Sequence, residues 1–179
     1  MFYCRKQKSD DAVKLTQFSN FALRTLQFAA IRHPELVRID DVAKAHRISK
    51  AHLMKATHQL GQWGFVETVR GRNGGLRLAR PAAEITVGEV LRRTEAPLEL
   101  VECFNPETNT CPLRAVCHLS RAFHRALASF LAVLDEVTIA DIARNRSDLM
   151  PRLGLTRAGA APKINSRRSM PRKAARAAK

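Results

Sequence analysis

Residues 39–80 carry the pattern that most limits how this chain can fold. The pattern predicts a short helix capped by Asp40 that runs through Ala45, a break at Ile48, and a second helix over 49–63 that ends before a glycine. Apolar residues at helical spacing would form the shared buried face: Val42, Ala43, Ile48, Leu53, Ala56, Leu60 and Trp63. Two short helices joined this closely predict a helix-turn-helix.

A β-hairpin is predicted directly after the second helix. Val66 and Val69, then Leu76 and Leu78, flank a glycine- and asparagine-rich stretch at 71–75. A helix-turn-helix followed by a hairpin is a winged helix, so we expect a mostly α fold with a small β-hairpin wing. The glycines lack the Lys-Ser/Thr pair of a phosphate-binding loop, which argues against nucleotide binding.

Polar and basic side chains gather on the parts of a winged helix that can read DNA. Four lie on the outer face of the second helix and three on the wing: Lys50, His52, Lys55 and His58, then Arg70, Arg72 and Asn73. Cations and ring donors suit phosphates and base edges in the major groove, and arginines on a narrow loop suit the minor groove. For the helix alone, an ordinary solvated basic face explains the pattern equally well.

Two more helices are expected beside this motif. An apolar stripe predicts a helix over 15–31 with Thr16 as its N-cap, and Asn20 lies off the stripe, where it could face a partner. A capping box of Thr86 and Glu89 predicts a helix that closes the domain.

Three of the four cysteines lie in one stretch with the spacing C-x7-C-x5-C, namely Cys103, Cys111 and Cys117. Thiolates favour iron–sulfur clusters, zinc or copper(I), and no secretory signal places them in an oxidising compartment. An iron–sulfur cluster tolerates wide gaps, whereas zinc usually has one short gap between its cysteines. A zinc site completed by His118 or His124, and unligated cysteines, remain alternatives.

A long helix is expected after the cysteines. Pro112 directly follows Cys111, as at the first position of a helix, whose N-terminus and nearby Arg114 would stabilise an anionic cluster. From Leu119, apolar residues step 4-3-4-3-4 and predict a coiled-coil seam: Leu119, Phe123, Ala126, Phe130, Val133 and Val137. So small a domain cannot bury this helix, which favours pairing with a second copy over packing on its own winged helix.

The net charge of +15 is concentrated at the C-terminus, because residues 144–179 hold eleven of the 31 Lys and Arg but only one acid, Asp148. This composition predicts a disordered tail that attracts nucleic acid. Cys4 lies in a patternless start and is expected to be a bystander. The expected organisation is a disordered extension, a winged helix-turn-helix domain, a cysteine loop with a dimerisation helix, and a disordered basic tail: 1–13, 14–96, 97–143 and 144–179. No apolar run is long enough for a membrane span.

Together, four stretches resemble the iron–sulfur transcription regulators, a family that includes the nitric-oxide sensor NsrR, the iron sensor RirA and the cluster-assembly regulator IscR. They are LTQFSNFALR at 15–24, VRGRNGGLRLARP at 69–81, VGEVLRRTE at 87–95, and the three-cysteine stretch. The resemblance covers about 15–142 and is strongest to the NsrR and RirA types, because Ser120 stands where IscR types carry a histidine.

The resemblance implies roles for particular residues. Cys103, Cys111 and Cys117 would bind a 4Fe-4S or 2Fe-2S cluster. Asn20 matches the position at which some NsrR proteins supply an aspartate ligand from the other subunit, although an amide is the weaker donor. The family's DNA contacts would map to the second helix and the wing: Lys50, Ala51, His52, Lys55 and Arg70.

We therefore expect a cytoplasmic homodimeric repressor that binds a double-stranded DNA operator in its cluster-loaded form and responds to nitric oxide. The same regulator sensing iron supply or redox state is the nearest alternative, followed by a zinc-stabilised DNA-binding protein without a sensing role. Enzyme activity is not expected, since the sequence lacks flavin, nicotinamide and second-cluster motifs.

Overall fold

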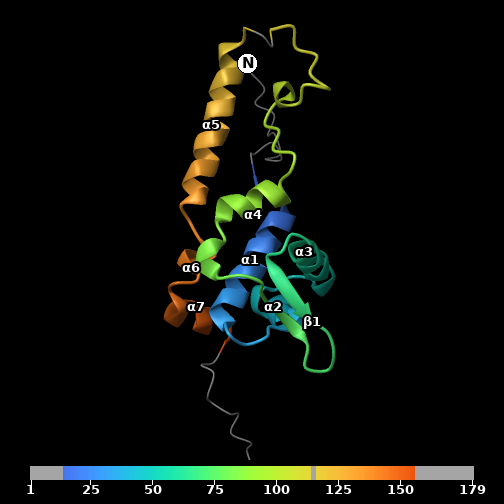
Figure 1. The fold of residues 1–179 in the computed structure, drawn as a ribbon, viewed down its shortest axis with the longest axis vertical. Coiled ribbons are helices and arrows are strands. Elements are labelled where there is room, and N and C mark those ends of the chain that lie inside the picture. The colour runs from blue at the N-terminus through green and yellow to red at the C-terminus, as the bar shows by residue number, and fades with distance from the viewer. Residues whose placement is uncertain (1–13, 114–115, 156–179) are drawn as a thin grey trace, which may run out of the picture.

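A computed structural model describes residues 14–113 and 116–155 of the chain. Its elements in chain order are α1 (Gln17–Arg32), α2 (Ile39–His46), α3 (Lys50–Gln62), β1 (Val66–Val69), β2 (Gly75–Leu78), η1 (Ala82–Glu84), α4 (Val87–Thr94), η2 (Glu102–Phe104), α5 (His118–Asp135), α6 (Ile139–Ile142) and α7 (Arg146–Arg152). The expected fold, mostly α with one small hairpin, is confirmed. In Figure 1, α1 lies at the centre, and α5 and the loop before it extend from the domain at the end away from the hairpin.

Helix α1 is the central element of the core. Thr16 caps it as predicted, since its side chain accepts a hydrogen bond from the Ser19 amide, and the helix ends at His33. Its buried stripe includes Ala22, Leu26 and Phe28, each at most 1% exposed. Because α1 packs against α3, α4 and α6, it connects the helix-turn-helix to the opposite side of the domain.

Helices α2 and α3 form the predicted helix-turn-helix. Arg47, at φ 55°, turns the chain between them in the left-handed region. One expectation is wrong: Asp40 does not cap α2, because the helix begins at Ile39 with Arg38 in the cap position. The Asp40 carboxylate instead lies 2.8 Å from Lys50 Nζ, and this contact ties the start of α2 to the start of α3.

The predicted hairpin is present, with Val66 paired to Leu78 and Val69 to Gly75. Gly71 takes φ 111°, which favours glycine at this turn. Strand β2 also pairs with Val37, just before α2, through hydrogen bonds of 2.8 and 2.9 Å to Leu76. This third backbone segment, which the sequence pattern did not reveal, fixes the wing against the helix-turn-helix.

Helix α4 begins as predicted but without a complete capping box. Thr86 Oγ1 accepts a hydrogen bond from the Glu89 amide at 3.1 Å. The Glu89 carboxylate does not return the bond, because it binds Arg80 Nη2 at 2.5 Å. Glu89 therefore links α4 to the segment after the wing instead of closing its own helix end.

Three expectations for the C-terminal half need correction. No helix begins at Pro112, since α5 begins at His118 and Cys117 is its N-cap. The helix ends at Asp135, two residues before Val137, the last expected seam position. The tail expected to be disordered from 144 begins with α7, where Met150 is 7% exposed and Leu153 and Leu155 pack against the core. Residues 1–13, Arg114 and 156–179 lie outside the described residues.

Candidate functional site

The outer face of α3 is exposed along its length, as predicted. Its exposed side chains are Lys50, Ala51, His52, Met54, Lys55 and His58. These side chains differ in the contacts that restrain them. Lys50 pairs with Asp40, and this ion pair lowers the pKa of the Asp40 carboxyl. His52 stacks on Phe21 of α1, with ring centroids 5.7 Å apart. Among the described residues Lys55 enters no ion pair, so it is the least constrained cation of this face.

The wing presents its candidate residues at the turn between β1 and β2. Arg70, Arg72 and Asn73 are all exposed, and no ion pair in the described part of the chain includes either arginine. The arginines of the return strand and of the segment after it are instead paired with carboxylates. Arg77 lies 2.9 Å from Glu67 across the hairpin, and Arg80 pairs with Glu89. The cations at the tip are therefore the ones that remain available for a polyanion.

A groove of about 380 Å³ separates α3 from the wing. It is lined by Arg38, Lys50, Met54, Thr68 and Arg72, among other residues. Arg38 is exposed at the start of α2 and was not among the residues predicted from the sequence. Only its position just before a helix-turn-helix could have indicated it. The groove brings cations from α2, α3 and the wing to one surface.

The three predicted cysteine ligands lie between α4 and α5 and differ in setting. Cys103 is in η2, Cys111 follows a turn, and Cys117 caps α5. All three are half-buried and free of disulfides. The Cys117 sulfur accepts a hydrogen bond from the Ser120 amide at 3.4 Å, which places it at the positive end of the α5 dipole.

Two asparagines shape the loop between the first and second cysteines. Asn105 Oδ1 accepts a hydrogen bond from the Glu107 amide at 3.0 Å. Asn109 Oδ1 accepts one from the Cys111 amide at 2.9 Å, and this bond orients the backbone of that cysteine. The Asn109 Nδ2 atom is buried without a hydrogen-bond partner in the described structure.

The donor set fits a thiolate-bound cluster in its chemistry. Three unpaired thiols share one loop, one of them lies at a helix N-terminus, and a buried amide donor next to Cys111 lacks a partner. Over the described residues, however, no three His, Cys, Asp or Glu side chains lie close enough together to hold one metal ion. A cluster contains several irons, so its thiolate ligands need not surround a single ion.

Asn20 lies on the first turns of α1 and is exposed. Directly beside it, a partly buried polar network joins α1 to the end of α4. Ser19, which is 0% exposed, donates to Thr94 Oγ1 at 2.6 Å and also binds the Glu95 carboxylate. Glu95 in turn accepts hydrogen bonds from the Thr16 amide and hydroxyl at 2.8 and 2.9 Å. This connection was not evident in the sequence.

Helix α5 exposes most of its predicted seam. Leu119, Phe130 and Val133 are 62%, 46% and 61% exposed, while Phe123 is half-buried. The helix is held at its C-terminal end, where Arg92 binds both oxygens of Asp135 at 2.5 and 2.6 Å. An apolar stripe this exposed, on a helix that packs on α4 near its C-terminal end, is typical of an interface.

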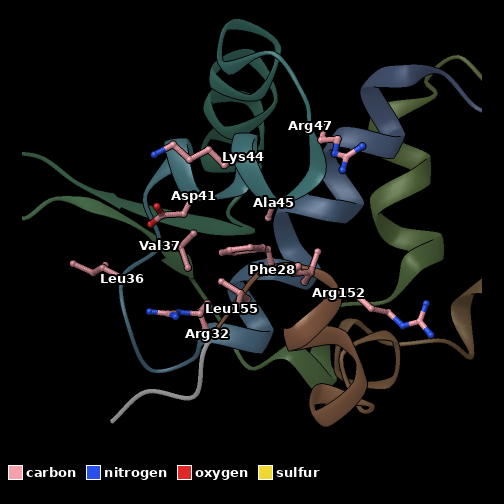
Figure 2. Close-up of a pocket in the computed structure, with 12 residues that line it drawn as sticks. Phe28, Arg32, Leu36, Val37, Asp41, Lys44, Ala45, Arg47, Arg152 and Leu155 are labelled. Carbon is pink, nitrogen blue, oxygen red and sulfur yellow. The ribbon is translucent and has the colours of Figure 1, made fainter. Parts of the chain in front are cut away.

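A separate cleft of about 540 Å³ lies between α1, α2 and the segment after α7. Figure 2 shows Phe28 and Leu155 near its centre, while the guanidinium groups of Arg47 and Arg152 point away from them. Its cationic groups do not converge on one point, so the cleft has no evident site for an anion. Its structural role is to hold the segment after α7 against the core.

In the described part of the chain, no helix is both long and apolar enough to cross a membrane.

Known proteins are similar to this chain over the residues described above. Residues 15–145 match Rrf2, a family described as an iron-dependent transcriptional regulator. The chain belongs to the Rrf2 family. This match spans the winged helix, the three cysteines and α5, so the expected membership in a family of winged-helix transcription regulators is confirmed.

Relatives within the family carry names that refine the resemblance. The HTH-type transcriptional regulator NsrR of Shouchella clausii is 47% identical over 76% of this chain and 93% of its own length. NsrR of Bacillus subtilis is 45% identical over 77% of this chain and 95% of its own. Among solved structures, T. potens IscR superposes with a TM-score of 0.61 at 22% identity, covering 75% of this chain and 88% of that one, and supports the fold alone. This chain is thus an NsrR-like transcriptional regulator of the Rrf2 family.

Proposed function

We propose that this protein is a homodimeric repressor that binds operator DNA while it holds an iron–sulfur cluster and releases the DNA when nitric oxide reaches the cluster. The observation that carries the proposal is the set of three unpaired thiols, Cys103, Cys111 and Cys117, on the segment that leads into a helix with an exposed apolar seam. The similarity to proteins named NsrR favours nitric oxide as the signal.

DNA reading is assigned to α3 and the wing. Lys50, Ala51, His52 and Lys55 would enter the major groove from one face of α3, and Arg70, Arg72 and Asn73 would follow the adjacent minor groove. The exposure of Lys55, Arg70 and Arg72 outside ion pairs supports this division. In a symmetric dimer, the two copies of α3 must lie about one DNA turn apart, roughly 34 Å.

The cluster, when bound, supplies iron that nitric oxide attacks. The chain's own residues then determine the response. The three thiols lie on the segment that joins α4 to α5, and α4 contacts α1 through Ser19 and Glu95. Because α1 packs on α3, a movement of the cysteine segment has a packed route to the DNA-reading helix. A change of about 3 kcal/mol in binding free energy corresponds to a roughly hundredfold change in affinity.

Asn20 is proposed as a fourth ligand supplied by the other subunit. Its exposure on the first turns of α1 allows this role, and a neutral amide oxygen would hold iron more weakly than a carboxylate. Asn20→Asp should then make the cluster more resistant to chelators and shift its absorbance. Identical decay curves for the two proteins would place Asn20 outside the ligand set.

Iron supply is a second candidate signal, favoured by the family's description as iron-dependent. The two signals are separated by exposing the loaded protein either to nitric oxide or to an iron chelator and following DNA affinity in each case. Loss of binding at stoichiometric nitric oxide, with slow loss in chelator, supports the first candidate. Rapid loss of DNA binding in chelator, with slow loss in nitric oxide, supports iron supply as the signal.

The experiment that tests ligation is replacement of each cysteine in turn. Cys103→Ala, Cys111→Ala and Cys117→Ala should each abolish the visible iron–sulfur absorbance of anaerobically purified protein, and Cys4→Ala should not. A colourless wild-type protein that contains zinc would instead support a structural metal site.

A further inference from the structure

One aromatic contact joins the cysteine loop to α5. Phe104, the residue after Cys103, stacks on His124, with ring centroids 4.0 Å apart and an angle of 11° between the ring planes. The other three ring pairs in the described residues have centroids 5.7 to 6.1 Å apart. The Phe104–His124 stack is therefore the closest ring pair described in the protein.

The orientation of the His124 ring is set by α5 itself. Its Nδ1 atom lies 2.8 Å from the Ser120 carbonyl oxygen, one turn earlier in the helix. A carbonyl can only accept, so Nδ1 must carry the proton and donate it. The ring is thereby fixed to the helix backbone, and the loop supplies the other half of the contact.

Hydrogen bonds and ion pairs do not provide a second link between the loop and α5 in the described residues. Over the residues described, no hydrogen bond or ion pair joins 98–113 to α5. Helix α5 packs on α4 near its C-terminal end, through Asp135, whereas His124 lies in its N-terminal half. Figure 1 shows the loop at the same end of the molecule as the start of α5.

We propose that the Phe104–His124 stack transmits the state of the cysteine loop to α5. Phe104 is the chain neighbour of Cys103, so a movement of Cys103 on gain or loss of a cluster would also move Phe104. Because His124 is fixed to α5, that movement displaces the exposed N-terminal half of the proposed dimer helix. Phe104 and His124 are positioning residues in this account and not ligands. The inference rests on the proposed function, since it assumes that Cys103 binds the cluster.

The test compares His124→Ala, which removes the stack, with His124→Tyr, which keeps a ring in place. Arg125→Ala truncates the next exposed residue of the same helix and is the matched control. For each full-length protein, cluster content is measured by visible absorbance, and affinity for selected duplex DNA is measured in the loaded and cluster-free forms.

We expect His124→Ala to hold its cluster. The ratio of its DNA affinity in the loaded form to that in the cluster-free form should be at least tenfold smaller than in the wild type. His124→Tyr and Arg125→Ala should keep the wild-type ratio. Three results would overturn the inference: an unchanged ratio in His124→Ala, an equal loss of affinity in both forms, or loss of the cluster itself. A wild-type protein whose DNA affinity ignores the cluster would instead overturn the proposed function.

Discussion

Arg70→Ala should reduce the salt dependence of DNA binding by a predictable amount. Arg70 directly follows β1, is exposed, and enters no ion pair in the described residues, whereas Arg77 on the return strand is already paired with Glu67. If Arg70 contacts one phosphate, its removal should lower the slope of log affinity against log salt by about 0.9 per contact. A dimer with two wings should therefore lose about 1.8 from that slope.

The expected effect is large enough to measure. Over a fourfold rise in salt, a slope difference of about 1.8 means that the wild type loses roughly tenfold more affinity than the variant. Fluorescence anisotropy with a labelled duplex at several salt concentrations measures this slope. Arg125→Ala removes the same charge from α5, away from the wing, and controls for net charge. Equal slope changes in the two variants would refute a specific contact by Arg70.

Three further predictions test the dimer helix, its attachment and the core of the helix-turn-helix. Phe130→Asp places a charge in the exposed seam of α5, where burial without a partner is costly, so sedimentation should report a monomer; an unchanged dimer would show that the seam is not the interface. Gly88→Ala should lower the free energy of unfolding by about 1–3 kcal/mol. A Cβ at position 88 would lie 2.1 Å from Asp135 Oδ1 and 3.0 Å from the Asp135 amide nitrogen, so α4 and α5 would have to separate; an unchanged urea midpoint would contradict this close packing. The pKa of His46 is lowered by burial and by the charge of Arg24. The unfolded chain therefore takes up this proton first as the pH falls below about 6.5, and stability should decline from there down to the lower folded pKa. His46→Phe should remove that part of the decline, and urea midpoints at several pH values would show whether it does.

The winged helix could be predicted because its signals are local. The helical spacing of residues 39–63, the glycines of the wing and the Thr16 cap each depend on neighbours within a few positions. The structure accordingly has α2, α3, β1 and β2 within about one residue of the expected bounds.

The errors arise where distant partners compete for a side chain. Asp40 and Glu89 have the residue types of helix caps, but Lys50 and Arg80 bind their carboxylates instead. A short local pattern cannot reveal the partners of these two carboxylates. The error at Pro112 is different, because α5 begins at His118 and the Cys117 sulfur caps it locally.

In the candidate site, too, features set by local sequence could be predicted, whereas contacts between distant residues could not. The exposure of Lys55, Arg70 and the α5 seam follows from periodicity, so these residues were named from the sequence. The network of Ser19 and Glu95 and the stack of Phe104 and His124 join residues 20 or more positions apart. Those contacts depend on tertiary packing, and only the structure brings them together.

The central claim is that three thiols on one loop control DNA binding through a cluster. The most direct measurement is anaerobic titration of the loaded, full-length protein with nitric oxide, following visible absorbance and DNA affinity in the same samples. The account predicts that both signals fall together, with affinity decreasing about a hundredfold, and that Cys111→Ala shows neither the absorbance nor the response. Full cluster content in Cys111→Ala, or DNA affinity that stays constant while the absorbance is lost, would contradict it.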